Sequence, residues 1–290
     1  MFQGSIPALV TPFRDGLVDR DAFKVLVERQ IKEGSSALVP CGTTGESSTL
    51  SLEEHEAVVE LCVEITRGRV PIIAGAGSND TAAGIRLVRH AKTIGADAAL
   101  VVAPYYNRPN QEGLFRHFSA IADSVQLPLV LYNVPSRTSC DLAPETVGRL
   151  SKHPNIVGIK DATGDLGRVA LHREFCGPDF ILLSGDDVTA LGFNAHGGTG
   201  CISVTANVAP RMFADLQAAT LRGDYAAARG LNDKLAPLHK ALFTDPSPGP
   251  TKYALSRLGL CAEEIRSPLF PAADYSRQAV DRALAIAGIA

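Results

Sequence analysis

Eight short apolar runs, most of them separated by stretches with helical periodicity, constrain the fold of this chain more than any other feature. Each run is often β-branched and is mostly bounded by glycine, proline or polar residues. Runs of this kind are typical of strands buried on both faces, and such strands belong to parallel sheets. The runs cover residues 6–10, 37–40, 71–74, 98–103, 127–131, 156–159, 180–183 and 200–204.

The segments between these runs predict amphipathic helices. One of them begins with Ser51-Leu-Glu-Glu54, a capping-box pattern. The expected helices cover residues 19–33, 51–67, 81–94, 112–124, 143–151, 166–175 and, more briefly, 186–196. Eight strands joined by seven helical crossovers predict an α/β fold of the (β/α)8 TIM barrel type, with an open doubly wound sheet as the alternative.

From about Ala206 the pattern becomes helical and rich in alanine, over residues 211–221, 224–243 and 275–286. The stretch Asp245-Pro-Ser-Pro-Gly-Pro250 interrupts it with prolines. One of these helices is needed to complete the barrel. We therefore expect a barrel over residues 1–223 and a C-terminal helical extension over residues 224–290 that packs on it and carries no catalytic site of its own.

Composition narrows the classes of function. A formal net charge of −3 argues against binding to nucleic acid or to an anionic membrane surface. The six cysteines form no C-x-x-C pair, which is typical of reduced thiols in a cytoplasmic protein, and the seven histidines show no metal-ligand spacing. No apolar stretch is long enough to span a bilayer, and the first residues lack a signal-peptide pattern.

Lys160 closes the sixth apolar run, at the end of a strand that we expect to be buried. Burying an ammonium group is costly, so such a site favours the neutral amine. A neutral amine is a nucleophile that attacks ketones and forms a Schiff base. A lone lysine at a strand end can also extend into solvent with no chemical role, so the other strand ends decide between the two interpretations.

Three other runs also end in unusually polar sequences. An isolated Gly-Thr-Thr-Gly could be an ordinary turn, paired tyrosines could be packing residues, and an arginine could be a surface cation. In an α/β barrel, however, the carboxyl ends of all strands meet on one rim, where active sites lie. The three sequences are Cys41-Gly-Thr-Thr-Gly-Glu46, Pro104-Tyr-Tyr-Asn-Arg-Pro109 and Tyr132-Asn-Val-Pro-Ser-Arg-Thr138.

The first of these sequences can bind a small carboxylate, because it combines two hydroxyls with backbone N–H groups that glycine leaves accessible. Nucleotide phosphate is not expected, since Gly75-Ala-Gly77 lacks the third glycine of a dinucleotide motif. A weaker signal for anion binding is Gly197-Gly-Thr-Gly200, ahead of the eighth run.

Over nearly all of its length up to the helical tail, the chain resembles the pyruvate-dependent class I aldolase family that includes N-acetylneuraminate lyase. Gly42-Thr-Thr-Gly-Glu46 and the strand of Lys160 resemble the wider family. Tyr105-Tyr-Asn-Arg-Pro109 and Tyr132-Asn-Val-Pro-Ser-Arg-Thr138 resemble a narrower set of members. Within the second sequence, Arg137 is similar to an arginine that distinguishes the dihydrodipicolinate synthase branch from the lyase branch.

The resemblance implies a role for each matching residue. Lys160 forms the imine with pyruvate, Tyr132 shuttles protons, and Thr43 connects Tyr132 to Tyr106 in a hydroxyl relay. Thr44 holds the carboxylate of pyruvate, and Arg137 meets the carboxylate of the incoming aldehyde. The backbone around Gly185 and Ile202 lines the pocket.

The implied reaction is the condensation of pyruvate with L-aspartate 4-semialdehyde to 4-hydroxy-tetrahydrodipicolinate, in lysine (diaminopimelate) biosynthesis. The lysine serves as the electron sink, so no metal or organic cofactor is expected. Two alternatives stay open: a pyruvate-dependent aldolase or lyase acting on a sugar acid, and a non-catalytic sensor of a keto acid. Arg137 and Tyr106 argue against the first, and intact Lys160, Tyr132 and Thr43 against the second.

The resemblance also concerns assembly and regulation. It implies a homotetramer built as a dimer of dimers, with Tyr106 crossing the tight dimer interface to complete the relay of the neighbouring subunit. Ser48, His55, Asn79 and Tyr105 match the interface region where lysine-inhibited members bind lysine. Leu52 and Ala83 replace a histidine and a glutamate that such members often have, so we expect weak or no inhibition by lysine.

Overall fold

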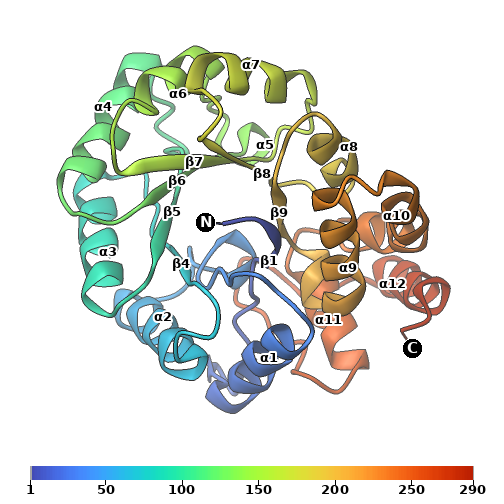
Figure 1. Cartoon of the computed structure of the whole chain (residues 1–290). Helices are drawn as coiled ribbons and strands as arrows, with labels where there is room; N and C mark the ends of the chain where they lie inside the picture. Colours follow the sequence, from blue (N-terminus) through green and yellow to red (C-terminus); the bar gives the residue numbers. More distant parts are fainter. Residues whose placement is uncertain (1, 290) are drawn as a thin grey trace.

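A computed structural model describes residues 2–289 and shows a ring of parallel strands enclosed by helices (Figure 1). Seven strands form one sheet in the order β1-β9-β8-β7-β6-β5-β4, and every pairing in it is parallel. Their bounds are β1 Gly4–Pro7, β4 Ile73–Gly75, β5 Ala98–Val102, β6 Leu129–Asn133, β7 Ile156–Asp161, β8 Ile181–Ser184 and β9 Gly200–Ser203.

Residues 37–40 occupy the eighth position of the ring, between β1 and β4. They make only isolated bridges, Ala8 to Val39 and Leu38 to Ile72, so the prediction of a regular strand here was wrong. The backbone hydrogen bonds still continue on both sides, for example from the Leu9 N–H to the Val39 carbonyl at 2.9 Å. The segment stays short because Pro40 has no N–H to donate and Cys41 turns the chain with φ 53°.

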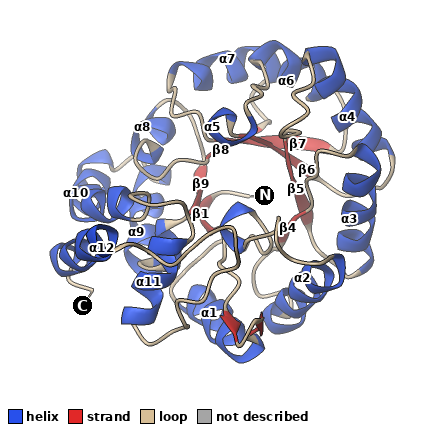
Figure 2. Cartoon of the chain, turned by 180° about the vertical axis from the view of Figure 1, so that it is seen from behind, coloured by secondary structure: helices blue, strands red, loops and turns tan. Residues whose placement is uncertain are grey.

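The barrel helices lie outside the ring, and Figure 2 shows the same arrangement from behind. Both hydrogen bonds of the predicted capping box form, between Ser51 and Glu54. The helix predicted from 186 begins only at Ala190, because the Asp186 carboxylate accepts from the N–H and hydroxyl of Thr189 and holds a turn. The barrel helices are α1 Arg20–Lys32, α2 Leu52–Thr66, α3 Thr81–Thr93, α4 Gln111–Asp123, α6 Pro144–Leu150, α7 Gly167–Cys176, α8 Ala190–Ala195 and α9 Pro210–Leu221.

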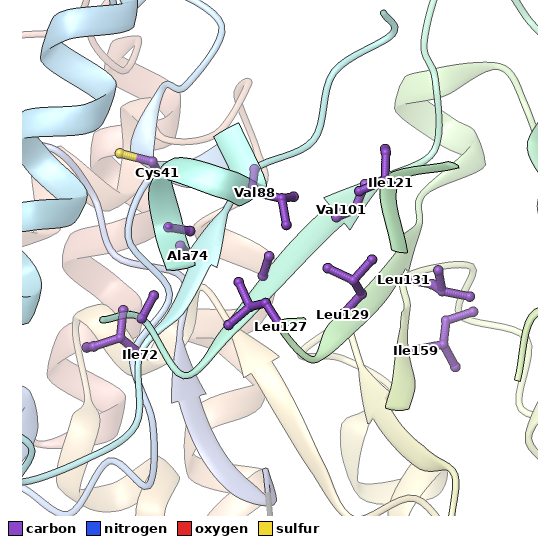
Figure 3. Packing of buried hydrophobic residues seen from close by; sticks show 14 of the residues in the cluster. Cys41, Ile72, Ala74, Val88, Val101, Ile121, Leu127, Leu129, Leu131 and Ile159 are labelled. Atoms are coloured by element: carbon purple, nitrogen blue, oxygen red, sulfur yellow. The ribbon is translucent and has the colours of Figure 1, made fainter. Parts of the chain in front are cut away.

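Alternation along the strands decides which side chains face the interior of the ring. In β6, Leu129 and Leu131 pack outward against the helices (Figure 3), whereas Val130 and Tyr132 belong to the cluster inside the ring. Successive side chains of a strand point to opposite faces. In β7 the outward position of Ile159 therefore turns its neighbour Lys160 inward.

Three helices follow the barrel: α10 Tyr225–Ala241, α11 Gly249–Arg257 and α12 Asp274–Ala287. They lie beside α9, outside the ring, and share one apolar cluster with the barrel that includes Cys201, Phe213, Leu238 and Val280. The predicted helical extension is therefore present. Its division from the barrel after residue 223 stays a prediction.

Some short elements were not predicted. Helix α11 starts at Gly249, inside the proline-rich stretch, where Pro250 occupies a first-turn position that needs no N–H donor. A hairpin of β2 Phe13–Arg14 and β3 Leu17–Val18 and the single turn α5 Pro135–Thr138 were also missed. Elements of two to four residues are too short to show a periodicity.

We expect the buried histidine of α4 to make stability depend on pH. Burial lowers the pKa of His117 from 6.5 to about 4, so the folded state keeps it neutral. A depressed histidine pKa contributes stability above pH 6.5 that is lost as the pH falls toward 4. Urea unfolding at pH 7 and pH 4.5 should show about 2 kcal/mol more loss for the unaltered chain than for His117→Asn. An equal loss in both would contradict this.

Candidate active site

Lys160 and Tyr132 lie side by side at the carboxyl ends of β7 and β6, where they pair in register. Both side chains are 6% exposed. The Lys160 Nζ lies 4.0 Å from the centroid of the Tyr132 ring. The structure thus places a buried amine against a buried phenol at the end of the strands where barrel chemistry occurs.

Gly185 follows β8 and leaves room for the lysine side chain. A Cβ atom at this position would lie 2.9 Å from the Cε of Lys160 and 2.7 Å from the Cβ of Ala162. Contacts that short force the neighbour to move, so a residue with a side chain here would displace the amine. Ile202, on β9, is 1% exposed inside the ring, in the same cluster as Tyr132.

The two threonines lie on a single 3-10 turn, Thr43–Gly45, that follows residues 37–40. Thr43 lines a cavity of about 280 Å³ together with Tyr132 and Arg137. Thr44 is buried at 5% exposure and does not line the cavity. The structure therefore brings Thr43, Tyr132 and Arg137 to one cavity, with Lys160 directly against the Tyr132 ring.

Tyr106 does not line this cavity, and its side chain is 90% exposed. Its backbone has φ 71°, an uncommon conformation for a bulky residue. The preceding Tyr105 does line the cavity. The loop is fixed by Asn107, whose side-chain amide donates to the Asn79 carbonyl at 2.8 Å.

Three of the four residues matched to lysine regulation border the same cavity, and Asn79 does not. Ser48, His55 and Tyr105 contribute to its lining. Burial lowers the pKa of His55 to about 4, so this imidazole is neutral near pH 7. Leu52 is exposed at the start of α2, and Ala83 lies half-buried in the first turn of α3. Neither side chain can supply a charge.

Two buried aspartates near the strand ends were not predicted to matter. Burial disfavours the charged form of Asp161, but hydrogen bonds from His172 and Thr163, with the charge of Arg168, lower its pKa. Asp161 therefore remains ionised and fixes the end of β7 on the face opposite to Lys160. Its place directly after Lys160 was the available signal.

Asp187 lies between β8 and the 3-10 turn η2 Thr205–Asn207. Its carboxylate accepts from the Ser203 hydroxyl and from the N–H groups of Val204 and Thr205 at 2.9 and 3.2 Å. It is 2% exposed, and it ties the loop after β8 to the end of β9. Only the paired acidic residues 186 and 187 after an apolar run hinted at it.

Residues 2–289 hold no cluster of three or more His, Cys, Asp or Glu side chains suited to a metal ion. Within the same range, no helix is long and apolar enough to cross a membrane. None of the six cysteines forms a disulfide in this structure.

The fold and the polar rim define an α/β barrel with its candidate chemistry at the carboxyl ends of the strands. The model of the dihydrodipicolinate synthetase family matches residues 1–287. A curated relative from Phenylobacterium zucineum, called 4-hydroxy-tetrahydrodipicolinate synthase, is 62% identical over 289 residues, covering 100% of this chain and 98% of that protein. The chain belongs to the dihydrodipicolinate synthetase family.

Solved structures agree with this assignment. Chloride-inhibited dihydrodipicolinate synthase from Acinetobacter baumannii, in complex with pyruvate, is 48% identical with a TM-score of 0.98, and each chain is covered completely. The 4-hydroxy-tetrahydrodipicolinate synthase of Methylacidiphilum fumariolicum is 45% identical with a TM-score of 0.98, covering 99% of this chain and 96% of the other. The predicted TIM barrel with a C-terminal helical part is confirmed.

Proposed function

We propose that this chain is a 4-hydroxy-tetrahydrodipicolinate synthase that joins pyruvate to L-aspartate 4-semialdehyde through a Schiff base on Lys160. The observation that carries the proposal is the Lys160 amine, buried at a strand end and 4.0 Å from the centroid of the Tyr132 ring. Tyr132 in turn lines a cavity together with Thr43 and Arg137. The names of its full-length relatives support the same activity.

The proposed chemistry starts with attack of the Lys160 amine on the ketone carbon of pyruvate. Loss of one water gives an iminium, which acidifies the adjacent methyl group, and loss of a methyl proton gives an enamine. The enamine carbon then attacks the aldehyde carbon of the semialdehyde, whose oxygen takes up a proton. The semialdehyde amine finally attacks the iminium carbon and releases Lys160 with the cyclic product.

Each of these steps moves a proton, so a phenol beside the amine is well placed to act. We assign that role to Tyr132, and we assign to Thr43 the link from Tyr132 toward Tyr106. Thr44 would hold the carboxylate of pyruvate. Gly185 and Ile202 would shape the pocket around the adduct, which agrees with the close approach of Gly185 to Lys160.

Arg137 would bind the carboxylate of the aldehyde substrate. It belongs to the turn α5, lines the cavity and is exposed to it. A guanidinium forms paired hydrogen bonds with a carboxylate, and a neutral sugar aldehyde would leave this group unmatched. The position of Arg137 therefore favours aspartate semialdehyde over a sugar substrate.

The proposed site is completed by a second copy of the chain. At 90% exposure, Tyr106 is far more exposed than a residue that relays protons within an active site. It directly follows Tyr105, which lines the cavity. We propose that Tyr106 enters the partner's site across a tight dimer interface, and that two dimers form a tetramer.

A panel of aldehydes tests the choice of substrate. With pyruvate present, aspartate semialdehyde should be consumed at least about a hundred-fold more efficiently than polyhydroxylated sugar aldehydes, because only it matches Arg137. The measurement is kcat/KM for each aldehyde. Preference for a sugar aldehyde would establish the sugar-acid aldolase instead, and absence of turnover together with absence of a pyruvate adduct would exclude both enzymes.

We expect lysine at millimolar concentration to leave most of the activity intact. A pocket for lysine must pair its ammonium, and neither Leu52 nor Ala83 can do so. Loss of one charged partner weakens binding by on the order of 2–5 kcal/mol, or tens-fold to thousands-fold. The measurement is the initial rate against lysine concentration, with Ala83→Glu as the matched variant that should become more sensitive. Strong inhibition of the unaltered chain below that range would show that Glu53 or Glu56 supplies the missing carboxylate.

A further inference from the structure

The turn that carries Thr43 and Thr44 is closed by Glu46, whose backbone adopts the left-handed conformation with φ 57°. Glycine usually occupies such a position, because other residues are strained there. Glu46 is nevertheless 3% exposed and directs its carboxylate into the protein. A charged residue kept at a strained and buried position requires a specific partner.

Lys252 is that partner, and it comes from α11 of the C-terminal extension. Its side chain is fully buried, and its Nζ lies 2.5 Å from Glu46 Oε1. The same ammonium donates to the Glu264 carbonyl at 2.7 Å and lies 4.2 Å from the centroid of the Phe13 ring. Burial lowers the pKa of Lys252, and the charge of Glu46 acts in the opposite direction.

Arg266, also in the extension, holds the second oxygen of the carboxylate. Its backbone N–H donates to Glu46 Oε2 at 3.0 Å. Its guanidinium donates to the Thr49 carbonyl at 3.0 Å and forms a two-point ion pair with Glu54 at the start of α2. Both oxygens of Glu46 therefore contact residues more than two hundred positions later in the chain, Oε1 through the ion pair and Oε2 through a hydrogen bond.

The other side of the turn packs against the first loop of the barrel. The Thr11 hydroxyl donates to the Gly45 carbonyl at 2.7 Å. A Cβ atom on residue 45 would lie 3.0 Å from the Leu9 carbonyl oxygen, so the backbone is already in contact. The turn is confined between this loop and the extension, and it can move toward or away from the cavity only if one of them yields.

A buried ion pair is a poor device for stability alone, because apolar residues of similar volume often stabilise a protein as well or better. What such a pair provides is a defined geometry, since each charge has one set of partners. Here that geometry belongs to the turn whose Thr43 lines the cavity.

We propose that the Glu46–Lys252 ion pair is a positioning device, by which the C-terminal extension sets the distance of Thr43 and Thr44 from the reacting pyruvate. This inference rests on the proposed function, since it assigns those two hydroxyls to the relay and to the pyruvate carboxylate. Glu46 and Lys252 are positioning residues, because they act through the turn. The extension is thus part of the catalytic apparatus although it contributes no side chain to the cavity lining.

The test uses three variants: Lys252→Met, Glu46→Gln and the double variant that combines these two changes. Each is compared with the control variant Arg277→Met. Arg277→Met is the matched control, because it breaks the 2.8 Å ion pair between Arg277 and Glu263 in the same extension, away from the turn. The single variants leave one buried charge unpaired and should unfold at a lower temperature. The double variant removes both charges, so its melting temperature should return toward that of the unaltered chain.

A positioning role predicts a specific kinetic result in each variant of Glu46 or Lys252 whose circular dichroism spectrum shows that it is folded. The kcat should fall by roughly ten-fold to a hundred-fold, and the KM for pyruvate should rise, because a displacement of about 1 Å costs that much. The KM for the aldehyde should stay unchanged, since Arg137 lies on another loop. The double variant should remain slow, and Arg277→Met should match the unaltered chain. Recovery of kcat together with the melting temperature in the double variant would overturn the proposal.

The rate of pyruvate adduct formation at Lys160, trapped by borohydride, separates this proposal from the proposed function. It requires no aldehyde. If the unaltered chain forms the adduct but does not condense aspartate semialdehyde, the proposed function fails, and a slower adduct in the folded double variant still supports positioning. An equal adduct rate in both chains, or no adduct in either, overturns the positioning role.

Discussion

Replacement of Lys160 by alanine is expected to abolish both the condensation and the covalent capture of pyruvate. The amine is buried at 6% exposure beside Tyr132, and Gly185 is the residue that leaves space for its side chain. No other lysine among residues 2–289 stands over the Tyr132 ring. Removal of the nucleophile should reduce turnover by on the order of a thousand-fold or more, equivalent to ~4 kcal/mol of barrier.

The measurement is borohydride reduction in the presence of pyruvate, followed by the mass of the intact chain and of its peptides. One reduced adduct should appear on the peptide that contains Lys160 and should be absent from Lys160→Ala. Lys152→Ala is the control, because Lys152 is exposed on the surface and should not affect labelling. A label on a different lysine would contradict the assignment of the Schiff base to Lys160, and so would the absence of any label.

Replacement of Tyr106 by phenylalanine is expected to inactivate the assembly, yet mixing it with Lys160→Ala should restore activity. Loss of the hydroxyl should reduce kcat by about a hundred-fold, since it interrupts the proton relay. In a mixed dimer, one site combines the intact Lys160 of one subunit with the intact Tyr106 of the other. Random mixing should therefore recover about a quarter of the original activity.

The control for this experiment is a mixture of Tyr132→Phe with Lys160→Ala. Tyr132 and Lys160 contact each other within one chain, so no mixed dimer contains a complete pair and no rescue is expected. If the Tyr106 mixture also showed no rescue, then Tyr106 would not act in the partner's site, and its 90% exposure would need another explanation.

The sequence alone determined the barrel, its direction and the strand ends whose polar residues share one rim, whereas the catalytic roles of those residues stay predictions. Buried parallel strands carry apolar residues in runs, so all eight positions of the ring were recognisable from composition and spacing, and seven of them form regular strands. Side chains at their ends, such as Tyr132 and Lys160, had to meet because the strands of a barrel are parallel. These features depend on local sequence and on one topological rule.

Only the tertiary structure decided features that depend on unusual backbone conformations or on partners distant in the sequence. Residues 37–40 form isolated bridges rather than a strand because the backbone turns at Cys41. Tyr106 is 90% exposed and has a positive φ of 71°, and no periodicity reveals either feature. The Glu46–Lys252 pair joins a turn of the rim to the C-terminal extension, and neither segment contains a sequence pattern that identifies its partner. The charges of Glu46 and Lys252 act on each other strongly because residues distant in the sequence bury them. That burial exists only once the chain has folded.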